Sequence, residues 1–145
     1  MSAKKKTAAT KTNASPKGEV GPNGFRVGYM PNGDFVEWLL DDGKEFPMIL
    51  RRGDKAIHKA CKEFWEKVWW NRHQSWLYAI ETGKEPLRKE QKPILERAKK
   101  AAARIQRKYG RKNLVMDDFE FGLLSGKLSA LSWVQGAEWE ESLDT

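Results

Sequence analysis

The stretch GFRVGYMPNGDFVEWLL, residues 24–40, contains an Asn-Gly pair between two apolar runs. Asn32 and Gly33 both tolerate positive φ, so the pair predicts a type I′ turn and a two-residue loop between antiparallel strands. Such a loop fixes a register in which six apolar residues share one face of the hairpin. The pairs are Tyr29 with Val36, Val27 with Trp38, and Phe25 with Leu40, and the opposite face holds Arg26, Gly28 and Glu37. Because the turn chemistry and the cross-strand pairing agree, the stretch predicts a β-hairpin.

Signals for one more strand and three helices follow the hairpin. A turn at Asp42-Gly43 and the apolar run 46–50 predict a third strand, and Pro47 places it at a sheet edge because proline cannot donate to a ladder. Asp117 and Glu120 have the spacing of a capping box at a helix start. We expect an α+β fold, with a small antiparallel three-stranded sheet over about 25–51 followed by three α-helices over about 54–82, 89–109 and 117–135.

Composition divides the chain into three parts. Residues 1–24 are mostly Lys, Thr, Ala, Asn, Ser, Pro and Gly with a single valine, and we expect a disordered, Lys-rich arm because such a segment cannot offset the entropy lost on ordering. Residues 25–136 are expected to form a single globular α+β domain, followed by an acidic tail over 137–145. With 39% hydrophobic and 11% aromatic residues, the chain is too apolar for a disordered protein and too interrupted by charge for a membrane protein.

Cysteine usage and the N-terminus bear on the compartment. The single cysteine, Cys61, cannot form an intrachain disulfide, so nothing indicates an oxidising environment. The N-terminus has lysines but lacks the apolar segment of a secretory signal. No run approaches the roughly 18 apolar residues that a membrane span needs. We therefore expect a cytoplasmic protein with no membrane partner.

The strongest functional signal is a basic segment. Residues 92–112 carry nine Lys and Arg against one acid, whereas residues 113–145 carry one Lys against seven acids. At 100° per residue, the apolar and basic side chains of this segment fall on two adjacent faces that do not mix. The apolar face holds Ile94, Ala98, Ala101, Ala102, Ile105 and Tyr109, and the basic face holds Arg97, Lys100, Arg104, Arg107, Lys108 and Arg111. The basic face would extend about 21 Å at 1.5 Å per residue, a length over which duplex DNA presents several phosphates.

The basic face is also compatible with two roles that involve no ligand. Lys, Arg and Ala are good helix formers and cations suit the C-terminal end of a helix, so the face can be a solvated surface. The acidic C-terminal segment is also able to fold over the face and neutralise it. The near absence of acids favours a polyanion instead, because a helix selected for solubility usually alternates its charges. Lys4, Lys5 and Lys6 of the arm would add a second contact to a nucleic-acid backbone.

The segment EKVWWNRHQSW, residues 66–76, adds aromatic side chains to a charged helix. Trp70 lies off the apolar arcs of this helix, which makes it a candidate for stacking on a base, although a neighbouring helix would cover it equally well. Arg72 projects between Trp65 and Trp76. Its guanidinium either packs on these indoles, which the helical spacing favours, or stacks on a base or contacts a phosphate.

Small residues mark the last predicted helix. Gly122, Gly126 and Ala130 recur every four residues and leave a groove in which another helix can approach closely. In a helix that also carries charges, this pattern favours a tight crossing within the chain over a homodimer seam.

The sequence contains no recognisable enzyme motif, such as a phosphate-binding glycine loop or a nucleophile elbow. His58 and Cys61 are three residues apart but lack further metal ligands at suitable spacing, so we expect no catalytic site, metal or cofactor. The leading hypothesis is a small non-enzymatic accessory protein that binds DNA or RNA mainly through the phosphate backbone, using the basic helix and the arm. The alternative is a protein-interaction or scaffold subunit that uses the small-residue helix and the acidic tail to dock a protein partner or a second copy.

Overall fold

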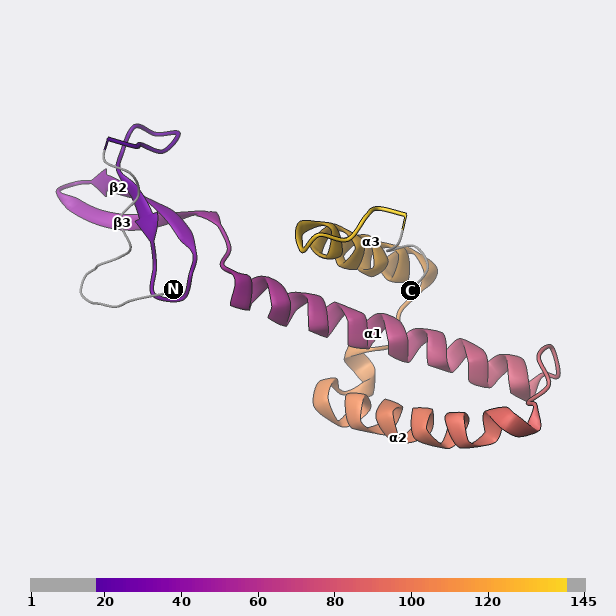
Figure 1. The fold of residues 1–145 in the computed structure, drawn as a ribbon. Helices are drawn as coiled ribbons and strands as arrows, with labels where there is room; N and C mark the ends of the chain where they lie inside the picture. The colour runs from indigo at the N-terminus through magenta and orange to yellow at the C-terminus, as the bar shows by residue number, and fades with distance from the viewer. Residues whose placement is uncertain (1–17, 141–145) are drawn as a thin grey trace. The chain divides into compact units, whose positions relative to one another are not determined.

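The structure, a computed structural model, describes residues 18–140 and has the predicted α+β fold, a three-stranded antiparallel sheet followed by three helices (Figure 1). The chain separates into two compact units, residues 1–59 and 60–145. The first unit contains the sheet and the second contains most of the helical chain. That residues 25–136 form one globular domain stays a prediction, and the two units are described in turn.

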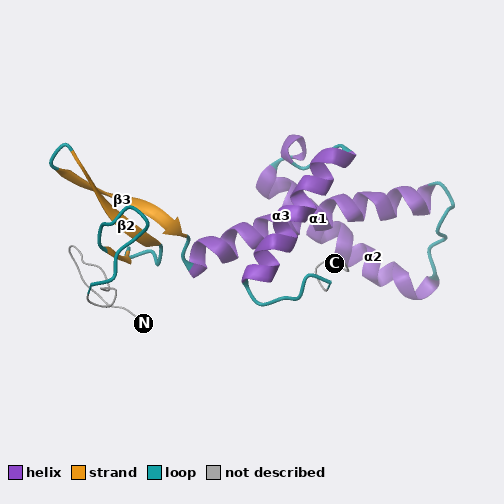
Figure 2. Cartoon of the chain, turned by 90° about the horizontal axis from the view of Figure 1, so that it is seen from above, coloured by secondary structure: helices purple, strands orange, loops and turns teal. Residues whose placement is uncertain are grey.

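The sheet has the strand order β1-β2-β3, with β1 at Val27–Tyr29, β2 at Phe35–Asp41 and β3 at Lys44–Arg51 (Figure 2). Strand β3 lies at an edge, as Pro47 predicted. A two-residue loop, Asp42-Gly43, joins β2 to β3 with φ values of 51° and 76°. Positive φ at both loop residues is what a type I′ turn requires, so the turn chemistry predicted for the first hairpin occurs in the second.

The first hairpin has a different turn from the predicted one. The Gly33 amide donates to the Met30 carbonyl at 2.9 Å, the Met30 amide donates to Asp34 at 2.8 Å, and Gly33 has a φ of 95°. These bonds enclose a three-residue loop, Pro31 to Gly33. Proline favours this loop because its fixed φ suits the second position of a type I turn that ends in a left-handed glycine. The predicted type I′ turn is therefore wrong. The longer loop shifts the register by one residue and pairs Val27 with Glu37 instead of Trp38.

The shifted register places Glu37 in the interior of the first unit, where it is 0% exposed. Its carboxylate accepts hydrogen bonds from the Asn23 amide at 2.9 Å, the Asn23 side chain at 3.0 Å and the Phe25 amide at 3.0 Å. A Cβ at Gly21 would lie 2.4 Å from the Glu37 carboxyl carbon, so any larger residue there would force the Glu37 side chain to shift. The ordered chain thus begins before Phe25. We assigned residues 18–24 to the arm, but they contact the sheet. Residues 1–17 lie outside the described chain.

A second buried carboxylate fixes the end of the sheet. Asp34 accepts a hydrogen bond from the Gly53 amide at 2.7 Å and lies 3.7 Å from the Arg52 guanidinium. Gly53 passes so close to the first hairpin that a Cβ there would lie 2.7 Å from the Gly33 carbonyl carbon. These contacts connect the hairpin turn to the chain that leads into the first helix.

The helices begin and end close to the predicted residues. Helix α1 spans Asp54–Glu81, α2 spans Lys92–Tyr109 after a 3₁₀ turn η2 at Lys89–Gln91, and α3 spans Asp118–Val134 after a 3₁₀ turn η3 at Arg111–Asn113. The capping box of α3 is confirmed, because the Glu120 amide donates to Asp117 at 2.8 Å and the Asp117 amide donates to Glu120 at 3.0 Å. Within residues 18–140, no helix combines the length and the apolar character needed to cross a membrane.

Helix α1 packs against both other helices, on different sides (Figure 1). Toward α2, the buried cluster is Trp70, Ala102, Ile105 and Leu114. Toward α3, the buried cluster is Val68, Leu124 and Leu128. Helix α1 therefore provides an apolar surface on each of two sides, one for each partner helix.

Candidate nucleic-acid interface

Helix α2 buries one side against α1 and presents the other to solvent. The buried side chains, Leu95, Ala102 and Ile105, recur at the spacing of a helix face. Ile94, which we expected on the apolar face, is half exposed, so the buried side is centred on Leu95 instead. The six residues of the predicted basic face are all exposed.

Four cations of that face form what we name the basic row: Arg97, Lys100, Arg104 and Arg107. Their spacing of three and four residues places them in a straight line along α2, over about 15 Å at 1.5 Å per residue. None of the four side chains has an ion-pair, hydrogen-bond or ring partner among residues 18–140. The nearest acid in the sequence, Glu96, lies 3.9 Å from Lys99, which is not part of the row. The row therefore presents unneutralised charge to solvent.

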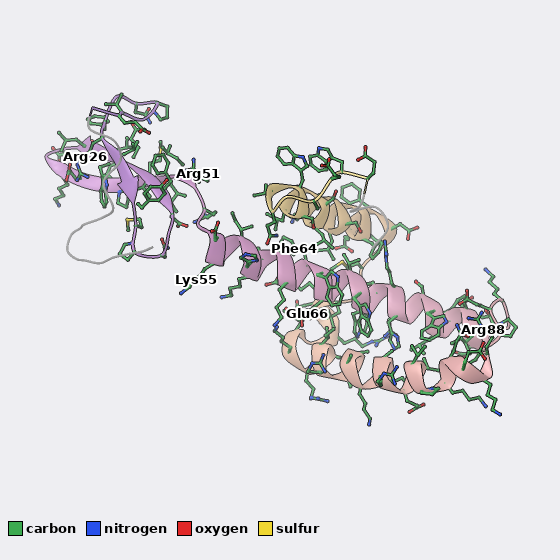
Figure 3. The ribbon with its side chains drawn as sticks, viewed as in Figure 1. Arg26, Arg51, Lys55, Phe64, Glu66 and Arg88 are labelled. Atoms are coloured by element: carbon green, nitrogen blue, oxygen red, sulfur yellow. The ribbon has the colours of Figure 1, made fainter. Side chains whose placement is uncertain are left out.

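Lys108 has a partner within the chain and so differs from the row. Its ammonium lies 2.9 Å from Glu66 of α1, and the Tyr109 hydroxyl donates to the same carboxylate oxygen at 2.7 Å (Figure 3). Burial alone would raise the pKa of Glu66, but the hydrogen bonds from Tyr109 and Lys108 outweigh it and lower this pKa below its usual 4.5. The Glu66 carboxylate in turn raises the pKa of Lys108. Lys108 is thus partly neutralised by α1, which the sequence did not predict.

Arg111 lies beyond the end of α2. Gly110, with a φ of 83°, ends the helix, and Arg111 opens the 3₁₀ turn that follows. Its guanidinium carbon lies 5.4 Å from the centre of the Trp70 ring, so Arg111 covers the core and does not continue the straight row.

Trp70 is buried, with 1% of its surface exposed, so of the two roles considered for it, cover by a neighbouring helix is the one that the structure shows. The indole packs against Ala102, Ile105 and Leu114, because α2 and the segment after it cover the side of α1 that appeared free in the sequence. The position of a covering helix depends on contacts between residues more than 30 apart, which the periodicity of α1 alone does not contain.

The cation–π cluster predicted around Arg72 does not form. Arg72 is exposed, and its side chain has no ion-pair, hydrogen-bond or ring partner within residues 18–140. His73 takes that place: its ring stacks on Trp69 at 5.2 Å and meets the edge of Trp76 at 6.3 Å. Burial, followed by the charge of Lys99, lowers the pKa of His73. The indole available to a ligand in α1 is Trp65, which is 48% exposed and lies seven residues before Arg72 on the same helix face.

The remaining predicted sites have different outcomes. Lys4, Lys5 and Lys6 lie outside the described residues. Gly122, Gly126 and Ala130 are exposed, and a Cβ added to either glycine would meet no atom within 4 Å. Among the described residues of the second unit, these small residues make no tight crossing, because α3 packs on α1 through its leucine side instead.

No group of three His, Cys, Asp or Glu side chains in residues 18–140 is arranged to hold a metal ion. The chain matches no protein family, no curated protein and no solved structure in the comparisons.

Proposed function

We propose that this protein binds nucleic acid through the phosphate backbone, with the basic row of α2 as the contact surface. The observation that carries this proposal is the absence of any partner for Arg97, Lys100, Arg104 and Arg107 within residues 18–140. Exposed cations that a protein needs for its own stability are usually placed near carboxylates, whereas unpaired cations in a line attract a polyanion.

The chemistry of the row favours backbone contacts over base reading. Three of the four residues are arginines, whose planar guanidinium groups bind phosphate oxygens in a bidentate manner. The charges lie about one helical turn apart, so successive side chains can contact successive phosphates. We infer a binding protein without catalytic activity that acts in the cytoplasm, where the one cysteine, Cys61, remains a free thiol.

The salt dependence of binding tests this proposal. Four engaged cations correspond to a slope of log K against log salt of about −3.6, at about −0.9 per phosphate of duplex DNA. Fluorescence anisotropy with a labelled duplex, a labelled single strand and a labelled RNA at several salt concentrations measures this slope and shows which form is preferred.

A charge-reversal variant locates the contact. Arg104→Glu with Arg107→Glu should weaken binding strongly and make the slope shallower by about 1.8. Lys55→Glu with Lys59→Glu is the matched control, because it changes the net charge equally at exposed positions of α1 outside the row. Equal losses in the two variants, or a flat slope for the unmodified protein, would contradict the proposal.

A further inference from the structure

Helix α3 is apolar on the side that faces solvent as well as on the side that faces α1. Projected at 100° per residue, the exposed side covers about 120° and contains no charged residue. Its large side chains are Phe119, Leu123, Trp133 and Val134, and its small residues are Gly122, Gly126 and Ala130. We name these seven residues the outer face of α3.

This face is unusual for a surface helix. Each of its four large side chains is at least half exposed, and Phe119 is 78% exposed. Trp139 stacks on Trp133 at 5.1 Å, and both rings still remain about half exposed. Contiguous exposed apolar patches of this kind mark interaction surfaces. The packing of α3 on α1 uses Leu124, Leu128 and their neighbours, so the outer face is uncovered within the described residues of the second unit.

The two terminal segments, residues 1–17 and 141–145, contain few apolar residues. Residues 1–17 contain Met1 as their only large apolar residue, and residues 141–145 contain only Leu143. Neither segment has the apolar side chains to match four large exposed ones.

We propose that the outer face of α3 binds the outer face of a second copy of this chain in an antiparallel, two-fold symmetric pair. A two-fold interface uses the same surface on both copies, so the surface must complement itself. The centre of the outer face does: an axis between Leu124 and Ser125 brings Leu123 opposite Gly126, and it brings Phe119 opposite Ala130. Each of these large side chains then meets a small residue, and the glycines allow the two helices to approach closely. Trp133 and Val134 lie beyond this part, at the level of the segment that precedes α3 in the other copy.

Charge at the rim of the face favours the same pairing. Glu120 and Lys127 lie along one edge of the outer face. In the single chain, the Lys127 ammonium lies 5.8 Å from the centre of the Phe64 ring of α1. In the antiparallel pair, this flexible side chain turns from Phe64 toward the Glu120 carboxylate of the other copy. Glu120 uses one carboxylate oxygen for the capping bond from Asp117, which leaves the second for this contact. In a parallel two-fold pair, Glu120 and Lys127 of one copy would lie on the opposite side of the interface from those of the other, so this contact forms only in the antiparallel orientation.

Sedimentation equilibrium or light scattering across the micromolar range tests this proposal. We expect the mass to rise with concentration from 16.7 kDa for one chain to twice that value. Gly126→Leu should abolish the rise, because the larger side chain blocks the approach of the second helix. The same change meets no atom within 4 Å in the monomer and improves helix propensity, so the variant should stay folded.

Three further variants make the result specific. Phe119→Glu should also give a monomer, whereas Tyr78→Glu, at an exposed aromatic residue of α1, should leave the dimer intact. Lys127→Glu should weaken the dimer several-fold, and adding Glu120→Lys should restore it. A mass of 16.7 kDa at every concentration, or a dimer that survives both Gly126→Leu and Phe119→Glu, would overturn the proposal. Since the basic row lies on α2, failure here leaves the salt dependence of nucleic-acid binding as a separate result.

Discussion

Replacing Tyr109 by Phe removes one atom and tests how α1 and α2 are joined. The Tyr109 hydroxyl donates to Glu66 at 2.7 Å, and the Glu66 side chain is buried. A hydrogen bond to a charged group contributes about 1.5–3 kcal/mol, so Tyr109→Phe should lower the free energy of unfolding at pH 7 by about 2 kcal/mol. The ring itself is retained, which keeps the packing against the core cluster.

The pH dependence of this loss identifies its cause. The pKa of Glu66 is below its usual 4.5 in the folded protein, so the stability gained from its charged form is fully present above pH 4.5 and is lost as pH falls through the folded pKa. The difference between Tyr109→Phe and the unmodified protein should therefore shrink between pH 7 and pH 3.

Urea unfolding followed by circular dichroism measures both effects. Tyr78→Phe is the matched control, because Tyr78 is exposed and its hydroxyl has no partner in residues 18–140, so its loss should change stability little. A loss below about 0.5 kcal/mol for Tyr109→Phe, or a loss of the same size at both pH values, would refute a charged hydrogen bond as the link between the helices.

Further predictions concern packing, titration and backbone space. Trp70→Ala should cost about 3–5 kcal/mol in urea unfolding, because the indole is almost fully buried. The pKa of His73 is below its usual 6.5 in the folded protein, so the unfolded chain takes up the proton first, and stability should fall as pH drops through 6.5; His73→Gln should lack this dependence in urea titrations. Gly53→Ala should lower the melting temperature because its Cβ would meet the Gly33 backbone, whereas Gly122→Ala should maintain or raise it because its Cβ meets nothing.

The helices were predictable because their signals are local. Asp117 and Glu120 specify the start of α3 within four residues of sequence, and Gly110 ends α2 by adopting positive φ. The basic row was predictable for the same reason, since helical periodicity alone places its four residues on one side.

The first hairpin shows how a local signal can mislead. Asn32-Gly33 favours a two-residue loop, but Pro31 favours a longer one, and the two differ by one residue of register. The correct register also buries Glu37, which only the hydrogen bonds from residues 23–25 make acceptable. Two of those three bonds come from Asn23, in a segment that composition alone assigned to an unfolded arm.

The neighbours of each helix were not predictable from periodicity. Trp70 and Gly126 both lie on faces whose environment depends on which distant helix covers them. Helix α2 covers the face that holds Trp70, whereas nothing in the described chain covers the face that holds Gly126. The ion pair between Glu66 and Lys108 likewise joins residues 42 positions apart and has no signature in the sequence.

Val68 and Trp70 lie two residues apart in α1, yet they belong to separate clusters, one with α3 and the other with α2. Weakening the contacts between α1 and one of these helices therefore leaves its contacts with the other helix in place. We expect the amides of α3 to exchange with deuterium independently of those of α2. The two helices would detach from α1 in two separate sub-global opening reactions. Leu128→Ala should then accelerate hydrogen exchange in α3 and leave exchange in α2 unchanged. The two outer helices of this unit would thus open separately, just as they pack separately.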